Sequence, residues 1–205
     1  MVIVLPHDLL RISSVNDLLE EEGPAWVSDF LLRAPFVVVR RALINEGLIP
    51  VGIRGEARNQ RHASLLAEQK ILERITPEQL AQGIGWKKYS RFRELPALQS
   101  LDLVEGLFAS YNLSWGPTGS VGFELASGVA TASKSSDLDI VIREPEGLSK
   151  AISKELTTEL KKAPCHIDVQ VETRYGAVAL LEVASGGSTI LIKRDKGPEL
   201  IENVF

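Results

Sequence analysis

The order of polar and apolar positions over residues 137–143, Asp-Leu-Asp-Ile-Val-Ile-Arg, predicts a β-strand, because two alternating acids lead into a β-branched run. Leu138, Ile140 and Ile142 fall on one face, where they can seal a sheet against a helix layer. Asp137 and Asp139 fall together on the other face. The predicted strand therefore has a core side and a side with paired negative charge.

A second alternating stretch covers residues 165–171. It places His166, Asp168 and Gln170 on one face of a predicted strand and the apolar residues 167, 169 and 171 on the other. Asp168 is therefore a third candidate carboxylate, although a solvent-facing acid on a strand would give the same pattern.

The remaining pattern mixes strands and helices. Strands are predicted at 36–42 and 48–54, joined by a turn at 44–47, and at 177–184 and 189–193, joined as a hairpin across 185–188. Helices are predicted at about 24–33, 63–75, 96–111 and 148–162, and the apolar pieces at 2–5 and 9–10 predict a small packed arm. Thr76, Pro77 and Gln79 give the start signals of a short helix that Gly83 ends. This mixture predicts an α+β fold with a domain boundary at 83–85.

Gly119 and Ser120 precede a predicted helix of one to two turns at 121–126, which Gly128 would end. A Gly-Ser turn at a helix start presents free backbone N–H groups and a hydroxyl, which together suit a phosphate. The glycine spacing here does not match a dinucleotide fingerprint, and no Gly-Lys-Ser/Thr follows for a P-loop.

Asp137 and Asp139 would repel each other on one strand face unless a cation lay between them. Hard divalent ions such as Mg²⁺ take carboxylate oxygens, so a metal site is the simplest interpretation. The alternative is a β-turn followed by two solvated acids at a strand start.

Arginine dominates the charge of residues 33–62, which contain six arginines, two acids and no lysine. A guanidinium meets phosphate oxygens with two parallel hydrogen bonds, so this cluster predicts recognition of a polyphosphate or nucleotide, with a solvated face as the alternative. Because side chains alternate along a strand, Arg40 and Arg41 cannot both point into one cleft without a bulge. The candidate binding residues are Arg40, Arg41, Arg54, Arg58 and Arg61.

Composition narrows the class of protein. The 205 residues are 44% hydrophobic and 24% charged, as in ordinary globular proteins, and the net charge is −4. Residues 1–85 hold 9 basic and 11 acidic residues and the rest hold 14 and 16, so neither half predicts nonspecific nucleic-acid binding. Residues 86–93 interleave basic and aromatic residues, a pattern that can bind nucleic acid, but we favour a connection between domains that could also line a cleft.

The single cysteine, Cys165, excludes an intramolecular disulfide and suits a reducing compartment. The N-terminal residues do not match a signal peptide, and no run of 18 apolar residues is present to cross a membrane. We therefore expect a cytoplasmic protein with no membrane partner.

The order of the motifs, Gly-Ser, a gap of about sixteen residues and then Asp-x-Asp on a strand, resembles the nucleotidyltransferase superfamily. The match is closer for residues 115–128, Trp-Gly-Pro-Thr-Gly-Ser-Val-Gly-Phe-Glu-Leu-Ala-Ser-Gly, followed by Ser-Asp-Leu-Asp at 136–139. The sequence of these two segments is similar to that of the phosphoribosyl-dephospho-CoA transferases that make malonate decarboxylase holo-acyl-carrier protein. Residues 35–41 and 49–55, with Arg58, Gln60 and Arg61, support the same family, so the motifs cover both halves of the chain.

The resemblance implies a C-terminal nucleotidyltransferase-type mixed sheet with helices, at 86–205, and a small N-terminal α+β domain at 1–83 that binds the donor. It implies transfer of 2′-(5″-phosphoribosyl)-3′-dephospho-CoA from its triphosphate precursor to a serine of the malonate decarboxylase acyl-carrier protein, with release of pyrophosphate. No nucleic acid is an expected partner.

The resemblance also implies residue roles. Asp137, Asp139 and Asp168 would be catalytic and hold two Mg²⁺ ions, and Asp168 could instead take the serine proton. Gly119 and Ser120 would hold the β- and γ-phosphates, and the arginines the donor's other phosphates.

Two other functions remain open at this point. A nucleotidyltransferase that uses an ordinary nucleoside triphosphate on a small molecule or RNA would share the C-terminal motifs and differ in the N-terminal half. A non-catalytic nucleotide-binding module should have lost one of the three acids, and all three are present.

Overall fold

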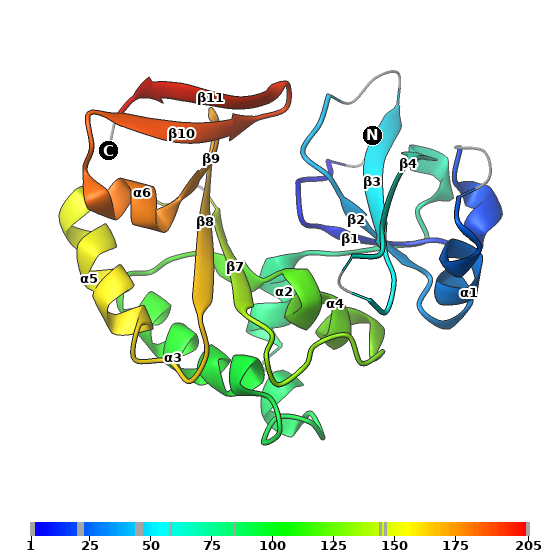
Figure 1. The fold of residues 1–205 in the computed structure, drawn as a ribbon, viewed down its shortest axis with the longest axis horizontal. Helices are drawn as coiled ribbons and strands as arrows, with labels where there is room; N and C mark the ends of the chain where they lie inside the picture. Colours follow the sequence, from blue (N-terminus) through cyan, green and yellow to red (C-terminus); the bar gives the residue numbers. More distant parts are fainter. Residues whose placement is uncertain are drawn as a thin grey trace.

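The computed structural model describes residues 3–19, 23–43, 47–57, 59–83, 85–143, 145 and 147–203. Two β-sheets, one in each half of the chain, form two lobes, and helices pack against both (Figure 1). The predicted α+β fold class is confirmed. No helix in the described part of the chain is long and apolar enough to cross a bilayer.

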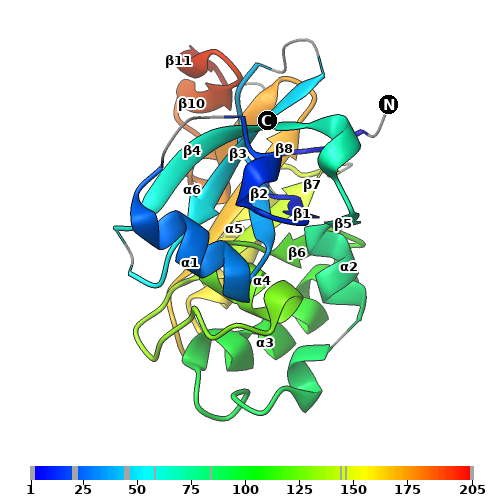
Figure 2. The same ribbon diagram turned by 90° about the vertical axis from the view of Figure 1, so that its right-hand side faces the viewer.

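The N-terminal lobe is built on a five-stranded antiparallel sheet in the order β4-β3-β2-β1-β5. Val27 and Leu31 pack from α1 into a core with Val37 and Val51 of the sheet, so α1 covers its outer face (Figure 2). Because side chains alternate along strands, the opposite face of the sheet is left to line the space between the lobes. The elements are β1 (Leu9–Arg11), η1 (Val15–Asp17), α1 (Ala25–Arg33), β2 (Phe36–Val39), β3 (Leu48–Arg54), β4 (Arg61–Ala67), η2 (Glu68–Lys70) and β5 (Glu73–Ile75), where η marks a 3₁₀ turn.

The helix predicted at 63–75 is wrong, because this segment forms β4, η2 and β5. Its leucines and isoleucines fit helical spacing, but Ser64 and Leu66 are the buried positions and pair in register with β3. Pairing with neighbouring strands thus overrides a local helical pattern. Likewise, Leu9–Arg11 lies between β2 and β5 inside the sheet and is more than the packed arm that its sequence predicts. The turn predicted at 44–47 lies mostly outside the described residues.

The C-terminal lobe contains a mixed six-stranded sheet in the order β11-β10-β9-β8-β7-β6. Strands β7 and β8 are parallel and are joined through α5, and the other neighbours are antiparallel. The elements are η3 (Gly85–Lys88), α3 (Pro96–Ser110), β6 (Trp115–Pro117), α4 (Gly119–Ser127), β7 (Leu138–Arg143), α5 (Lys150–Leu160), β8 (Ile167–Thr173), β9 (Gly176–Ala179), α6 (Leu180–Ser185), β10 (Thr189–Arg194) and β11 (Gly197–Glu202).

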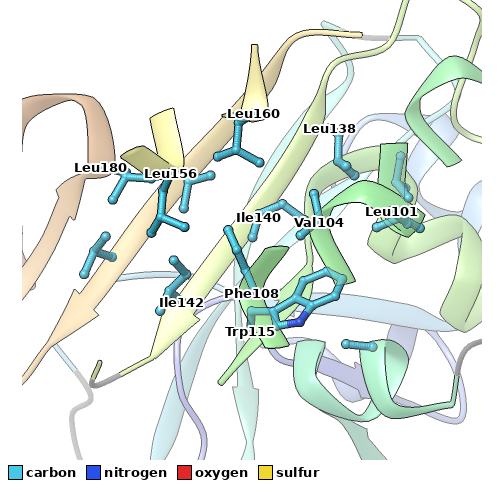
Figure 3. Packing of buried hydrophobic residues seen from close by; sticks show 14 of the residues in the cluster. Leu101, Val104, Phe108, Trp115, Leu138, Ile140, Ile142, Leu156, Leu160 and Leu180 are labelled. Carbon is cyan, nitrogen blue, oxygen red and sulfur yellow. The ribbon is translucent and has the colours of Figure 1, made fainter. Parts of the chain in front are cut away.

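The core of this lobe forms where α3 and α5 cover one face of the sheet (Figure 3). Ile140 and Ile142 of β7 pack there with Phe108 of α3 and Leu156 of α5, so the predicted core face of the strand is confirmed. Trp86 is also fully buried in this core, and its Nε1 donates a hydrogen bond to Asp102 at 3.0 Å. The aromatic part of residues 86–93 therefore supports the core.

The hairpin predicted from 177–184 and 189–193 is also corrected. The apolar run divides into β9 and the short helix α6, and β9 then pairs antiparallel with β10. Leu180 and Val183 of α6 are buried in the core, which explains why a run of apolar residues continues past the end of the strand. The last strand, β11, pairs along the whole of β10 and was not predicted.

The short helix α2 (Pro77–Gln82) joins the lobes and packs against β6 and α4. As the sequence predicts, Thr76 caps it, a capping box forms with Gln79, and Gly83 ends it. A Cβ atom on Gly116 of β6 would lie 2.0 Å from the carbonyl group of Pro77, so this approach requires glycine.

A buried ion cluster ties the lobes together. Asp8 is fully buried, and its two carboxylate oxygens accept hydrogen bonds from Arg74 at 2.6 Å and from Arg143 of β7 at 2.9 Å. Arg143 also donates to the carbonyl oxygen of Pro6 at 2.7 Å. The acid-bearing strand β7 is therefore held in a fixed position relative to the N-terminal sheet.

Candidate active site

The three candidate acids lie at the N-terminal ends of the neighbouring strands β7 and β8. Asp139 and Asp168 are register partners on these adjacent parallel strands, and Asp137 directly precedes β7. Asp137 and Asp139 are half-buried, and the side chain of Asp168 is 65% exposed. Asp168 accepts a hydrogen bond from His166 Nε2 at 3.0 Å. Across the residues that the structure describes, no three His, Cys, Asp or Glu side chains converge closely enough to hold a metal in their present rotamers.

The electrostatics of Asp139 reflect these neighbours. Burial raises its pKa, and the negative charges of Asp168 and Asp137 raise it further. Electrostatic interactions with His7 and Arg54 offset only part of this effect. Asp139 therefore carries an uncompensated charge when it is ionised.

Gly119 brings the start of α4 against Asp139. Its φ is +58°, and a Cβ atom there would lie 1.9 Å from Asp139 Oδ2, so no larger residue fits. The N–H of Thr118 donates to the carbonyl oxygen of Asp139 at 2.8 Å, which fixes the turn on β7. Thr118 makes no side-chain cap, and the first intrahelical bond is donated by Gly122, so the N–H groups of Gly119 and Ser120 have no partner within the helix. The predicted helix after this turn, with its end at Gly128, is confirmed.

Two pockets meet at this turn. The first, of about 410 Å³, is lined by Gly119, Asp139 and Asp168 together with His7, Gln170 and Lys193. The second, of about 470 Å³, lies over the N-terminal sheet and is lined by Arg40, Arg54 and Arg61. His7 and Gly119 belong to both, so Asp139 and Asp168 border one continuous cleft with these arginines, hereafter the interlobe cleft. Asp137 lines neither pocket.

The candidate arginines divide between two places. Arg40, Arg54 and Arg61 line the interlobe cleft, whereas Arg41 lies outside the arginine-lined pocket and forms a short hydrogen bond with Glu172 and a contact of 3.7 Å with Asp195. Arg41 therefore connects β2 to the C-terminal lobe. Arg58 lies outside the described residues.

Arg54 is unusual because it is a buried cation with no ion pair to an acid among the residues that the structure describes. It is 8% exposed, its Nε atom has no hydrogen-bond partner, and its guanidinium lies 5.9 Å from the ring centroid of Phe123. Burial and the charge of Arg61 lower its pKa to about 10. A buried guanidinium is normally paired with an acid, so burial without such a pair sets Arg54 apart from the other cleft arginines.

Comparisons with known proteins agree with this arrangement. The model of the phosphoribosyl-dephospho-CoA transferase MdcG C-terminal domain matches residues 79–204, and that of the N-terminal domain matches residues 5–77. The chain belongs to the phosphoribosyl-dephospho-CoA transferase family. It is thus an enzyme of the transferase class.

Proteins named phosphoribosyl-dephospho-CoA transferase resemble the chain over nearly its full length. That of Pseudomonas putida (strain GB-1) is 41% identical over 196 residues, which cover 96% of this chain and 92% of the relative. That of Pseudomonas syringae pv. tomato is 37% identical over 98% of this chain and 93% of the relative, and that of Azotobacter vinelandii is 39% identical over 96% and 92%. No solved structure matches the chain.

Three residues of the interlobe cleft were not among the predicted site residues. His7 has φ +74°, and its Nε2 lies 2.8 Å from Gln170 Nε2 and 3.6 Å from Glu172 Oε1. Lys193 Nζ lies 3.4 Å from Gln170 Oε1. Gln170 was recognisable because it shares a strand face with Asp168, but His7 and Lys193 reach the cleft only through strand pairing that no local motif signals.

Proposed function

We propose that this transferase moves 2′-(5″-phosphoribosyl)-3′-dephospho-CoA from its triphosphate precursor to a serine hydroxyl of the malonate decarboxylase acyl-carrier protein and releases pyrophosphate. The names of the family and of its members support the transferred group. The observation that carries the proposal is the continuous interlobe cleft, with carboxylates at one end and an unpaired, buried guanidinium at the other.

The donor set of the acids fits Mg²⁺ by its chemistry. Asp137, Asp139 and Asp168 offer carboxylate oxygens, which hard divalent cations prefer, and the raised pKa of Asp139 marks a position where added positive charge is favourable. Asp168 would turn from His166 toward Asp139 to join the set. When bound, two such ions would neutralise charge on the attacking and leaving oxygens. Asp168 serves the reaction either as a ligand or as the group that takes the serine proton.

The chain's own groups suit each part of the reaction. The serine oxygen forms a bond to the α-phosphorus, the bond to the bridging oxygen breaks, pyrophosphate leaves, and the serine proton passes to a base. The unpartnered N–H groups of Gly119 and Ser120 suit the β- and γ-phosphates, because the start of α4 carries positive partial charge. Arg54 and Arg61 suit the remaining negative charge of the donor.

The test is mass spectrometry of purified apo acyl-carrier protein after incubation with the enzyme, Mg²⁺ and the triphosphoribosyl donor. We expect a mass increase equal to the phosphoribosyl-dephospho-CoA group, on a serine, and one pyrophosphate released for each modified carrier. Asp139→Asn and a chelator should each remove the signal. A serine-to-alanine carrier is the matched control.

The same assay separates the proposal from its main alternative. If ATP replaced the triphosphoribosyl donor and released pyrophosphate with a small molecule or RNA as acceptor, the enzyme would be an ordinary nucleotidyltransferase. If the carrier stayed unmodified with active, metal-loaded enzyme, the assigned acceptor would be wrong.

A further inference from the structure

Three adjacent strands of the N-terminal sheet bring small side chains into one row on the cleft face. Val38 of β2 is the register partner of Gly52 of β3, and Gly52 is the partner of Ala63 of β4. All three line the arginine-lined pocket. Because strands lie about 4.8 Å apart, the three residues of this row form a floor about 10 Å wide. We call this row the small-residue floor.

Arginine residues are positioned on or directly after the strands at both ends of the small-residue floor. Arg54 follows Gly52 by two residues on β3, and its register partner Arg61 precedes Ala63 by two residues on β4. Both arginines therefore lie on the same face of the sheet as the floor. Arg40 lies two residues beyond Val38, but toward the other end, because β2 and β3 are antiparallel and the N–H of Arg40 donates to the carbonyl oxygen of Pro50. With about 6.7 Å for two residues, the backbone position of Arg40 lies roughly 13 Å along the strands from those of Arg54 and Arg61.

Gly52 is the centre of this arrangement. A Cβ atom on Gly52 would meet Arg40 Cδ at 3.4 Å and Cγ at 3.5 Å, so the aliphatic stem of Arg40 lies over the glycine. Its φ is outside the left-handed region, so a side chain at this position needs no unusual backbone. The glycine therefore keeps the floor flat.

The end with Arg54 faces the catalytic residues. Its guanidinium lies 5.9 Å from the ring centroid of Phe123 of α4, the helix that begins at Gly119 beside Asp139. Gly119, which also borders the pocket with the acids, lies on this side of the pocket, whereas the backbone hydrogen bond from His7 to Val39 places His7 near Arg40. A ligand on the floor would thus direct the substituent at this end to the reacting centre.

We infer that the small-residue floor binds the adenosine of the donor, an inference that rests on the proposed function. A flat apolar surface fits one face of a purine, and guanidinium planes stack on heteroaromatic rings. The donor carries phosphates on both sides of its adenosine: the triphosphoribosyl arm, which would meet Arg54 and Arg61, and the diphosphate of the dephospho-CoA arm, which would meet Arg40. An ordinary nucleoside triphosphate has phosphates on one side only, so cations at both ends favour the two-armed donor.

Calorimetric titration with dephospho-CoA tests the inference on the full-length enzyme. Gly52→Leu fills the floor and displaces Arg40, so the affinity for dephospho-CoA should fall about ten- to a hundredfold, the range of a lost base-stacking contact. Ala63→Leu, at an exposed position of the same row, should act alike and serves if Gly52→Leu does not fold. Gly106→Leu is the matched control, because Gly106 is exposed on α3 with open space around its Cβ.

Two further probes assign the ends of the floor. Inorganic tripolyphosphate should bind Gly52→Leu as it binds the wild type, because its site at Arg54 and Gly119 is unchanged, and 4′-phosphopantetheine, which lacks adenosine, should bind both weakly. The inference is overturned if dephospho-CoA binds the wild type no better than 4′-phosphopantetheine, or binds both floor variants with unchanged affinity.

The carrier-protein assay distinguishes this failure from failure of the proposed function. Carrier modification without any effect of Gly52→Leu on dephospho-CoA binding would place the adenosine elsewhere. The expected binding results with an unmodified carrier would keep the adenosine subsite and refute only the acceptor.

Discussion

Replacement of Arg54 by methionine should stabilise the free enzyme and weaken donor binding, two effects of opposite sign. Methionine approximates the length of the arginine stem and removes the charge. Arg54 is 8% exposed and its Nε has no hydrogen-bond partner among the described residues, so the desolvation of its charge is only partly compensated in the ligand-free protein. A donor phosphate would supply that compensation.

The magnitude follows from the pKa of Arg54, which falls to about 10, roughly 2.5 below its usual value. At 1.36 kcal/mol for each pKa unit, the folded environment disfavours the charged form by about 3 kcal/mol. The substitution also removes the cation–π contact with Phe123, of about 1–2 kcal/mol. A net gain of about 1 kcal/mol remains, which corresponds to a rise in Tm of about 2–4 °C for a chain of this length. Loss of a charge-assisted hydrogen bond of about 1.5–3 kcal/mol should weaken donor binding about ten- to a hundredfold.

Thermal melts of ligand-free protein and calorimetric titration of the donor, in a background silenced by Asp139→Asn, measure the two effects separately. Arg74→Met is the matched control, because Arg74 Nε donates to buried Asp8 at 2.6 Å. That variant should lose about 3 kcal/mol of stability, since it breaks a buried ion pair. A lowered Tm for Arg54→Met together with unchanged donor affinity would show that Arg54 is a structural residue and refute the reasoning.

Three other substitutions test the acids and the turn. Asp139→Asn should reduce transfer by about 10²–10⁴-fold. It should also raise the Tm at pH 7, because burial, Asp168 and Asp137 raise the pKa of Asp139 and its ionised form therefore destabilises the fold. The Tm difference between variant and wild type should shrink as the pH falls through that raised pKa, and a difference that is constant with pH would contradict this prediction. Burial raises the pKa of Glu172, but hydrogen bonds from His7, Arg41 and Gln170 outweigh burial and hold the pKa at about 2. Ionised Glu172 therefore stabilises the fold by up to about 3 kcal/mol above its usual pKa of 4.5, and this stabilisation is lost as the pH falls from 4.5 to 2. Glu172→Gln should remove that acid sensitivity in pH-dependent unfolding curves, and an unchanged curve would exclude the role. Gly119→Ala should abolish transfer and lower stability by about 1–2 kcal/mol, because its Cβ would overlap Asp139 Oδ2 at a positive φ; retained turnover would show that the turn can move.

The elements that carry the acids were predictable because one local pattern encodes both their packing and their chemistry. On β7 the same alternation buries Leu138 and Ile140 and turns Asp139 toward the cleft. The helix after Gly119 and the capped helix after Thr76 were predictable for a similar reason, since their start and end signals lie within the segments themselves.

The secondary structure of residues 63–75 and the position of His7 in the cleft could not be predicted locally, because both depend on residues that are distant in the sequence. Apolar residues at 65, 66, 71 and 72 suit a helix and two short strands equally, and only pairing with β3 and β1 decides between them. His7 reaches the cleft because β1 pairs between β2 and β5, and its backbone N–H donates to the carbonyl oxygen of Val39. The sequence could show that Arg40 and Arg41 differ in direction, but it could not show that Glu172, 131 residues away, pairs with Arg41.

The charges of the interlobe cleft give a reason why the lobes must be held at a fixed separation. Asp139 forms no ion pair with a described cation, and Arg54 forms none with a described acid. The attraction between the two is weak, because it offsets only part of the raised pKa of Asp139 and of the lowered pKa of Arg54. Collapse of the cleft would pair them and remove both binding sites. The buried cluster of Asp8, Arg74 and Arg143 lies at the junction of the lobes and opposes such a collapse, because moving β7 would break hydrogen bonds of 2.6 and 2.9 Å to a fully buried carboxylate. The buried cluster thus keeps a negatively charged and a positively charged side of the cleft apart, and under the proposed function a metal-bound polyphosphate would bind to both at once.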